Sequence, residues 1–279
     1  MTKRLYFEDS YAREFEAEVL EKFVREGKPA AALNQTCFYP ESGGQPSDRG
    51  RLDGAVVVHV FEEEEKIIHL LDRELTSQKV HGLIDWPRRF DHMQQHSGQH
   101  ILSQCFIEAL NGETKSFHLG ELTSTLEIGI SAISEEELEK IELRANEVVF
   151  EDREIKTYFV PQERIEGVPL RKPPKKEGTI RVVEISEFDY SACGGTHCRR
   201  TGEIGLIKVT RWDKIRNNLR FEFLCGKRAW ADYLLKNRAV QEISQKFSVQ
   251  EKDAPAAVEK LFQEAKQARK KMRQLQEAL

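Results

Sequence analysis

A cysteine and a histidine stand four residues apart in residues 191–197, which read SACGGTH, with two glycines between them. The glycines let this loop turn tightly, so the thiol of Cys193 and the imidazole of His197 can bend toward one point. Far upstream, His96 and His100 are also four residues apart, a spacing that puts both on one face of a helix. Because zinc accepts sulfur and nitrogen ligands in a tetrahedral shell, the four residues together predict a zinc site.

Two residues next to the predicted ligands, His92 and Cys198, are also of types that can bind metal. His92 also lies four residues before His96, and we expect it to be a surface or capping residue in the first turn of the helix. Cys198 follows His197 directly and should point elsewhere, which predicts a structural role. A hydrolase with a cysteine nucleophile and a histidine base is an alternative, but no spacing rule singles out Cys193 as the thiol with the lowered pKa that this chemistry needs.

The elements that must position these residues divide the chain into three predicted segments and give an α+β fold. Residues 1–88 contain several short strand-like runs separated by turn residues, which is typical of a small β-barrel. Residues 89–235 mix strands with amphipathic helices, the first of which is expected to begin at an Asp91 cap after Pro87 and to end at Asn111-Gly112.

Residues 236–279 are predicted to form a helical tail. Toward its end, apolar residues alternate spacings of three and four, which is a heptad seam. They are Val258, Leu261, Ala265, Ala268, Met272, Leu275 and Leu279. The seam predicts either a coiled coil that joins two chains or a helical hairpin that packs on its own domain. Because the chain stops within this pattern, one interpretation is that a further domain follows the coiled coil; the helical hairpin is the equal alternative.

Composition bounds the kind of protein that this can be. The 279 residues suffice for two domains, each with its own core. The net charge of -4 excludes a strongly basic chain, so any nucleic-acid partner must be met by a local patch. No apolar run reaches the ~20 residues that cross a bilayer, and the N-terminus lacks a secretion signal. Five scattered cysteines argue against a disulfide framework, which predicts a reduced, cytoplasmic protein.

Several motifs resemble the editing domain of alanyl-tRNA synthetases, and they match the freestanding alanyl-tRNA editing proteins, the AlaX family, still better. These motifs occupy residues 93–103, 116–120, 193–197 and 201–208, and the loop at residues 38–50 resembles the glycine motif of the barrel that precedes this domain. The resemblance extends from the N-terminus to about residue 235. Since no aminoacylation segment precedes the barrel, we expect the freestanding type, with a tail that resembles the long AlaX form.

The resemblance implies that His96, His100, Cys193 and His197 bind zinc and that the enzyme is a zinc-dependent hydrolase. The substrate would be alanine tRNA that carries serine or glycine by mistake, an error that a synthetase pocket for alanine cannot fully prevent. Zinc could activate a water molecule or anchor the α-amino group of the substrate. A non-catalytic RNA-binding module with a structural zinc and a dimerising tail is the alternative, and a hydrolase of free small amino-acid esters is a third, weaker one.

Three further groups of residues are predicted around this site. Thr114, Ser116 and His118 lie on a segment that should face the metal, where they would read a hydroxyl group or position water as catalytic residues; ordinary strand polarity is the alternative. In the glycine motif, Gly43, Gly44 and Gln45 are expected to contact the substrate, although paired glycines can also serve only to make tight turns.

We call residues 191–197, which carry Cys193 and His197, the metal loop. RNA contact is expected from basic residues after this loop, where a patch could follow the phosphate backbone and one aromatic ring could stack on an unpaired base. These residues are Lys208, Arg211, Trp212, Lys214, Arg216, Arg220, Lys227 and Arg228.

Overall fold

The computed structural model describes residues 1–174 and 178–278, so Leu279 of the predicted tail lies outside the described residues. Helices and several separate sheets occur together in these residues, which confirms the mixed α+β fold. The chain separates into two compact units that meet between Ala229 and Trp230. The predicted boundaries near residues 88 and 235 stay predictions. No helix in the described ranges is both long and apolar enough to cross a membrane.

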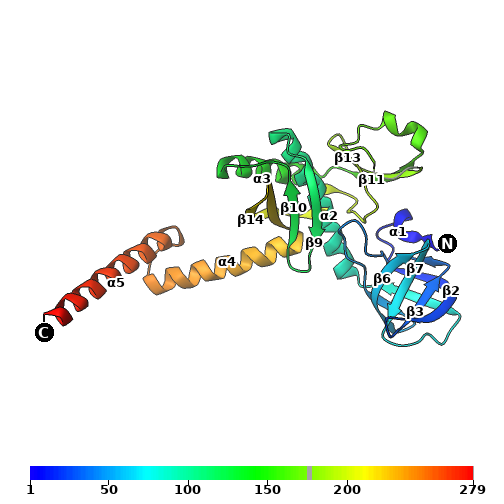
Figure 1. Cartoon of the computed structure of the whole chain (residues 1–279), viewed down its shortest axis with the longest axis horizontal. Helices are drawn as coiled ribbons and strands as arrows, with labels where there is room; N and C mark the ends of the chain where they lie inside the picture. The colour runs from blue at the N-terminus through cyan, green and yellow to red at the C-terminus, as the bar shows by residue number, and fades with distance from the viewer. Residues whose placement is uncertain (175–177, 279) are drawn as a thin grey trace. The chain divides into compact units, whose positions relative to one another are not determined.

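Six antiparallel strands close into a barrel in the N-terminal part of the chain, drawn from blue to cyan in Figure 1. Around the barrel they are β2 (Glu14–Arg25), β3 (Lys28–Leu33), β7 (Lys66–Leu71), β6 (Ala55–Glu63), β5 (Gly50–Leu52) and β8 (Lys79–Ile84). Buried and exposed residues alternate along the first half of β2 and along β8, as strands with one face toward a core require. Two short elements, β1 (Lys3–Arg4) and α1 (Leu5–Glu8), precede the barrel, and β1 pairs with β4 (Gln35–Thr36).

The long helix α2 (Trp86–Leu110) follows the barrel directly. Its start at Trp86 corrects the predicted start at Asp91. The side chain of Asp85 caps the helix by accepting a hydrogen bond from the backbone N–H of Arg88, and Pro87 occupies the first turn, where proline needs no intrahelical donor. The predicted end is confirmed, because Asn111 adopts the left-handed conformation with φ 52°.

Two sheets surround α2. The four-stranded sheet contains β14 (Ile207–Ile215), β15 (Asn218–Cys225), β10 (Ser124–Ile128) and β9 (Thr114–Leu119) in that order, and the three-stranded sheet contains β11 (Ile155–Val160), β12 (Ile180–Ile185) and β13 (Asp189–Ala192). Helix α3 (Glu135–Phe150) contacts both α2 and β14. Two short 3-10 helices, η1 (Gln162–Gly167) and η2 (Thr201–Ile204), lie in the connections.

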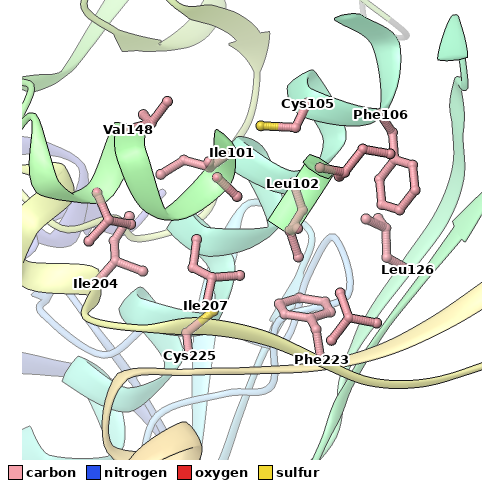
Figure 2. Packing of buried hydrophobic residues seen from close by; sticks show 14 of the residues in the cluster. Ile101, Leu102, Cys105, Phe106, Leu126, Val148, Ile204, Ile207, Phe223 and Cys225 are labelled. Atoms are coloured by element: carbon pink, nitrogen blue, oxygen red, sulfur yellow. The ribbon is translucent and has the colours of Figure 1, made fainter. Parts of the chain in front are cut away.

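The core of this region forms on the C-terminal half of α2. Figure 2 shows Leu102 and Phe106 of α2 beside Leu126 of β10 and Phe223 of β15, and all four are fully buried. Ile101 and Cys105 of the same helix belong to the same core. Because these contacts fix the rotation of α2 about its axis, they also fix the direction in which its histidines point.

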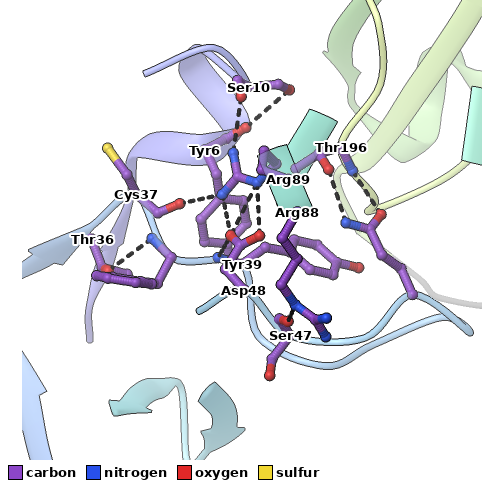
Figure 3. A network of polar contacts seen from close by, with 12 residues as sticks. Tyr6, Ser10, Thr36, Cys37, Tyr39, Ser47, Asp48, Arg88, Arg89 and Thr196 are labelled. Carbon is purple, nitrogen blue, oxygen red and sulfur yellow. Dashed lines mark hydrogen bonds and ion pairs between the residues drawn. The ribbon is translucent and has the colours of Figure 1, made fainter. Parts of the chain in front are cut away.

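One buried ion pair joins α2 to the loop between β4 and β5 (Figure 3). The guanidinium group of Arg89 binds the carboxylate of Asp48, and neither side chain is exposed. The remaining donors of Arg89 are satisfied by the carbonyl oxygens of Ser10 and Cys37 at 2.9 and 2.6 Å. Asp48 also accepts a hydrogen bond from the backbone of Tyr39. The loop that bears the glycine motif is therefore held against α2 at a defined position along the helix.

The second unit consists of most of helix α4 (Gly226–Phe247), the 3-10 helix η3 (Glu251–Asp253) and helix α5 (Ala254–Glu277). The helical character predicted for the tail is present in these residues. The larger seam residues of α5 remain exposed in the single chain, namely Val258, Leu261, Met272 and Leu275.

Candidate metal centre

The structure brings together the four residues predicted to bind metal. The ligand atoms of His96, His100, Cys193 and His197 all lie within 4.8 Å of one another, so the cluster could hold a metal ion. The sulfur atom of Cys193 lies 3.5 Å from Nε2 of His96 and 3.3 Å from Nε2 of His197. All three histidines are buried, while Cys193 is partly exposed. Three nitrogens and one sulfur form a donor set that suits zinc.

Each histidine of the cluster uses its other ring nitrogen to bond away from the centre. Nδ1 of His96 contacts Oε1 of Gln45 at 2.8 Å, Nδ1 of His100 contacts Asp189 at 3.1 Å, and Nδ1 of His197 contacts the hydroxyl of Ser97 at 3.1 Å. These outer partners fix the orientation of each ring and leave Nε2 for the metal, as in established metal sites.

Gln45 supports His96 from the barrel side. Its side chain is fully buried, its oxygen accepts a hydrogen bond from the backbone N–H of Thr196 at 3.2 Å, and its NH₂ group donates to the Thr196 hydroxyl at 2.9 Å (Figure 3). These partners determine which way the amide faces, so its oxygen accepts from Nδ1–H of His96. The sequence placed Gln45 against the substrate; in the structure its side chain contacts a metal-ligand candidate and the metal loop.

Two glycines permit the close approaches that build the centre. Gly44 has φ +84°, and a Cβ atom there would lie 2.6 Å from the carbonyl oxygen of Phe117. Its own carbonyl accepts a hydrogen bond from the backbone of Leu119, which docks the glycine loop on β9. A Cβ atom on Gly195 would collide with the ring of His96. By contrast, a Cβ atom on Gly43 would meet no other atom within 4 Å, so its φ of +58° is what favours glycine there; its predicted contact with the substrate stays a prediction.

Arg181 of β12 holds the metal loop through hydrogen bonds to its backbone. Its Nη1 atom donates hydrogen bonds to the carbonyl oxygens of Cys193 and Gly195, both at 2.9 Å. The arginine is almost completely buried, and burial lowers its pKa while the neighbouring Cys193 opposes that effect. This cation therefore shapes the loop and places positive charge next to the thiol.

The electrostatics favour the protonation states that a metal requires at Cys193 and His197. At His100, burial lowers the pKa, but the hydrogen bonds to Asp189 and Cys193 raise it overall. Burial raises the pKa of the Cys193 thiol, but the charges of His96 and His197 and the hydrogen bonds of His100 and His197 together lower it by more, so the net pKa lies well below the usual range. Burial and the nearby His96 lower the pKa of His197 to about 3. A thiolate beside neutral imidazoles is the state in which these groups bind a divalent cation.

The three residues predicted to be catalytic lie in different environments. Phe117 of β9 stacks on His96, with ring centroids 5.2 Å apart. Side chains alternate along a strand, so Ser116 and His118 point to the opposite face, where both are exposed and Ser116 donates a hydrogen bond to Glu127. The structure does not bring these two residues to the cluster.

Thr114 differs because the pairing of β9 with β10 shifts register between Thr114 and Ser116. Its hydroxyl donates a hydrogen bond to Ser103 of α2 at 2.6 Å, and Gln99 donates to the same Ser103 oxygen at 2.7 Å. Ser103 lies three residues after His100, which makes them neighbours on the helix surface. Thr114 is therefore the one predicted catalytic residue that lies on the α2 side of β9.

The expectation that His92 is a surface or capping residue is wrong. His92 is only 2% exposed, because α2 begins six residues earlier and His92 already lies in its packed part. Burial, and secondarily Arg88, lower its pKa to about 3, and its Nδ1 atom has no hydrogen-bond partner among the described residues. Cys198 is also buried, and its backbone N–H donates to Ser97.

Four of the seven basic residues in the predicted RNA patch have acidic partners. Lys208 pairs with Glu142, Arg211 with Asp213 and Glu222, Arg220 with Glu127, and Arg228 with Asp91. The ring of Trp212 is partly buried against the core. Lys214 and Arg216 are exposed at the hairpin end of β14, and Lys227 lies in the first turn of α4. RNA binding by this group stays a prediction.

Comparison with known proteins gives three kinds of match. Residues 180–221 match the family described as "Threonyl and Alanyl tRNA synthetase second additional domain". The chain is 36% identical to the alanine–tRNA ligase of Pyrococcus furiosus and 35% identical to that of Thermococcus kodakarensis, with all of this chain and 32% of each ligase covered. It is also 35% identical to the alanyl-tRNA editing protein AlaX-L of Pyrococcus horikoshii over 82% of this chain. The chain thus spans about a third of these ligases and 59% of AlaX-L.

The outer partner of His96 provides a test of the centre. Replacing Gln45 with leucine removes the acceptor for Nδ1–H of His96 at nearly constant volume, so we expect the affinity for zinc to fall by about 10- to 100-fold. Competition with a chromophoric chelator measures this change. Gln104→Leu, on a partly exposed face of the same helix, is the matched control and should bind zinc like the unmodified chain. Equal affinity of the two variants would contradict the assigned role of Gln45.

Proposed function

Because this chain is a homologue of the alanyl-tRNA editing protein AlaX-L and of part of alanine–tRNA ligase, as its motifs indicated, we propose that it edits mischarged alanine tRNA. The reaction is hydrolysis of the ester that joins serine or glycine to the terminal ribose. The observation that carries this proposal is the buried cluster of three histidines and one cysteine, each histidine braced by its own outer partner. We place this activity in the cytoplasm, where charged tRNA is used.

The proposed metal is zinc, held by His96, His100, Cys193 and His197. The donor set, the lowered pKa of Cys193 and the hydrogen bonds at all three Nδ1 atoms fit zinc. Bound there, zinc would supply a positive centre that polarises the ester carbonyl or holds the α-amino group of the substrate.

The chain itself supplies hydrogen-bonding groups beside the cluster. We assign Thr114, together with Ser103, to reading the hydroxyl of a misattached serine or to holding the attacking water. Phe117 covers one face of His96 and limits the access of bulk water to that ligand. The exposed Ser116 and His118 are left out of this proposal because their side chains point away from Phe117 and the cluster.

The alternative is an RNA-binding module in which the metal is structural. A specific observation favours it: four protein ligands that lie within 4.8 Å of one another can fill a tetrahedral shell completely, as structural zinc sites do. The alternative predicts tRNA binding with no hydrolysis.

Deacylation of charged alanine tRNA separates the two functions. We expect rapid loss of serine or glycine, with alanine spared. Cys193→Ala should reduce the rate by at least about 100-fold, because a lost ligand displaces the metal, and chelation should do the same. Thr114→Val, which removes one hydroxyl at similar volume, should reduce the rate for serine more than for glycine. A chain that holds zinc and binds tRNA without hydrolysing any of the three esters would support the binding module.

We also propose that the chain forms a homodimer through the seam of α5. The seam carries large apolar residues that stay exposed in the single chain, and a second copy in register would cover them. Light scattering should give the mass of a dimer, and Leu261→Asp combined with Leu275→Asp should give a monomer. Gln263→Asp, on the polar face of α5, is the control. A monomer that persists at high concentration would overturn this proposal.

A further inference from the structure

Several arginines lie near the N-terminal end of α2, and three of them are used neither by the proposed chemistry nor by the buried ion pair of Arg89. Arg88 comes from α2, Arg49 from the loop that carries the glycine motif, and Arg228 from the start of α4. Arg228 is neutralised, because it binds Asp91 at 2.7 Å and the carbonyl oxygen of Gly120 at 2.8 Å. The positive charges of Arg88 and Arg49 are less compensated by neighbouring acidic groups than the charge of Arg228.

The Arg88 side chain is held in place at Nε, while its two terminal nitrogens remain available for a ligand. Its Nε atom donates a hydrogen bond to the carbonyl oxygen of Ser47 at 3.2 Å, and Figure 3 shows this contact. In the part of the chain that the structure describes, its two terminal nitrogens have no hydrogen-bond partner. The side chain is only partly exposed. Arg88 is thus an oriented cation with up to four unused N–H donors.

The charge around Arg88 is not balanced by the acids nearby. Asp48 is already bound to Arg89, Asp85 caps α2, and Glu121 lies 3.8 Å from Arg49 with both side chains largely exposed. Burial and, after it, Arg49 lower the pKa of Arg88, whereas Asp48, Glu121 and Asp85 raise it less. This balance indicates two cations that repel each other, and an anion placed between them would be stabilised.

The position of Arg88 relative to the metal centre follows from the helix. Arg88, His92 and His96 succeed one another at intervals of four residues, and each interval rises about 6 Å along the axis. Arg88 therefore lies about 12 Å along α2 from the metal ligand. The loop beside it runs antiparallel to α2, since Gln45 contacts His96 and Ser47 contacts Arg88. A chain of phosphates that leads from an ester at the metal toward the N-terminal end of α2 would pass Arg88.

We propose that Arg88, together with Arg49, binds backbone phosphates of the single-stranded 3′ end of the charged RNA. This inference rests on the proposed function, and it identifies an RNA site that differs from the basic residues after the metal loop. Because planar guanidinium groups bind phosphate oxygens through paired hydrogen bonds, Arg88 would set how deeply the terminal nucleotide enters. The residues at 208–220 would then contribute less, since most of their charges are already paired.

The test compares two esters that differ in phosphate. Seryl-charged alanine tRNA carries the phosphates, and seryl adenosine carries none. Arg88→Gln should raise KM for the charged tRNA by about tenfold or more and leave hydrolysis of seryl adenosine unchanged, because it removes a charge-assisted contact to phosphate. The dependence of log kcat/KM on log salt should become shallower by about 0.7 for each lost contact to a single strand. Arg88→Lys should restore part of the affinity.

Control variants make the result specific. Arg49→Gln changes an exposed side chain, so it tests the same site without risk to folding, and it should act in the same direction. Arg25→Gln, at an exposed arginine of β2 that pairs with Glu63, should leave KM near the value of the unmodified chain.

The possible outcomes separate this inference from the proposed function. An unmodified chain that hydrolyses neither ester would refute both. An active chain in which Arg88→Gln and Arg49→Gln change neither KM nor the salt dependence would overturn this site alone. Equal losses on both esters would also overturn it, because Arg88 would then support the metal centre instead of binding phosphate. If seryl adenosine is not hydrolysed, the salt dependence with charged tRNA decides the matter.

Discussion

The arrangement of this protein depends on the requirement that each histidine of the cluster bonds outward through Nδ1. Only then do three Nε2 atoms face a single point together with the sulfur of Cys193. The three outer partners come from different places: Gln45 from the barrel loop, Ser97 from α2 itself and Asp189 from β13. A centre built this way exists only when the barrel, the helix and the three-stranded sheet are all in place.

The other buried polar groups serve the same requirement. Arg89 and Asp48 neutralise each other inside the protein and hold the barrel loop in the position along α2 where Gln45 contacts His96. Arg181 holds the carbonyl groups on either side of the metal-loop turn. Isolated buried ion pairs contribute little to stability, but losing one partner is costly, so these groups favour one arrangement over others. The hydrophobic core on the far side of α2 keeps the helix from rotating (Figure 2).

The sequence allowed the ligand set to be predicted because its two spacings have simple geometric meanings, one on a helix and one in a glycine turn. The end of α2 at Asn111 was predictable for the same reason, whereas its start is earlier than predicted because Pro87 fits the first turn of the helix and Asp85 caps it. Facing was harder. Alternation along β9 puts Ser116 and His118 opposite Phe117, and a register shift turns Thr114 back toward α2. The supporting roles of Gln45, Asp189 and Arg181 depend on contacts between residues far apart in the chain, which no local pattern reveals.

The central claim is that three histidine Nε2 atoms and one cysteine sulfur bind a single metal ion. X-ray absorption spectroscopy of the zinc-loaded chain tests this claim most directly, because it counts ligands by type and distance. The account predicts about three nitrogen neighbours near 2.0–2.1 Å and one sulfur near 2.3 Å. The sulfur contribution should disappear in Cys193→Ala. A shell without sulfur in the unmodified chain, or one dominated by oxygen, would contradict the centre described above.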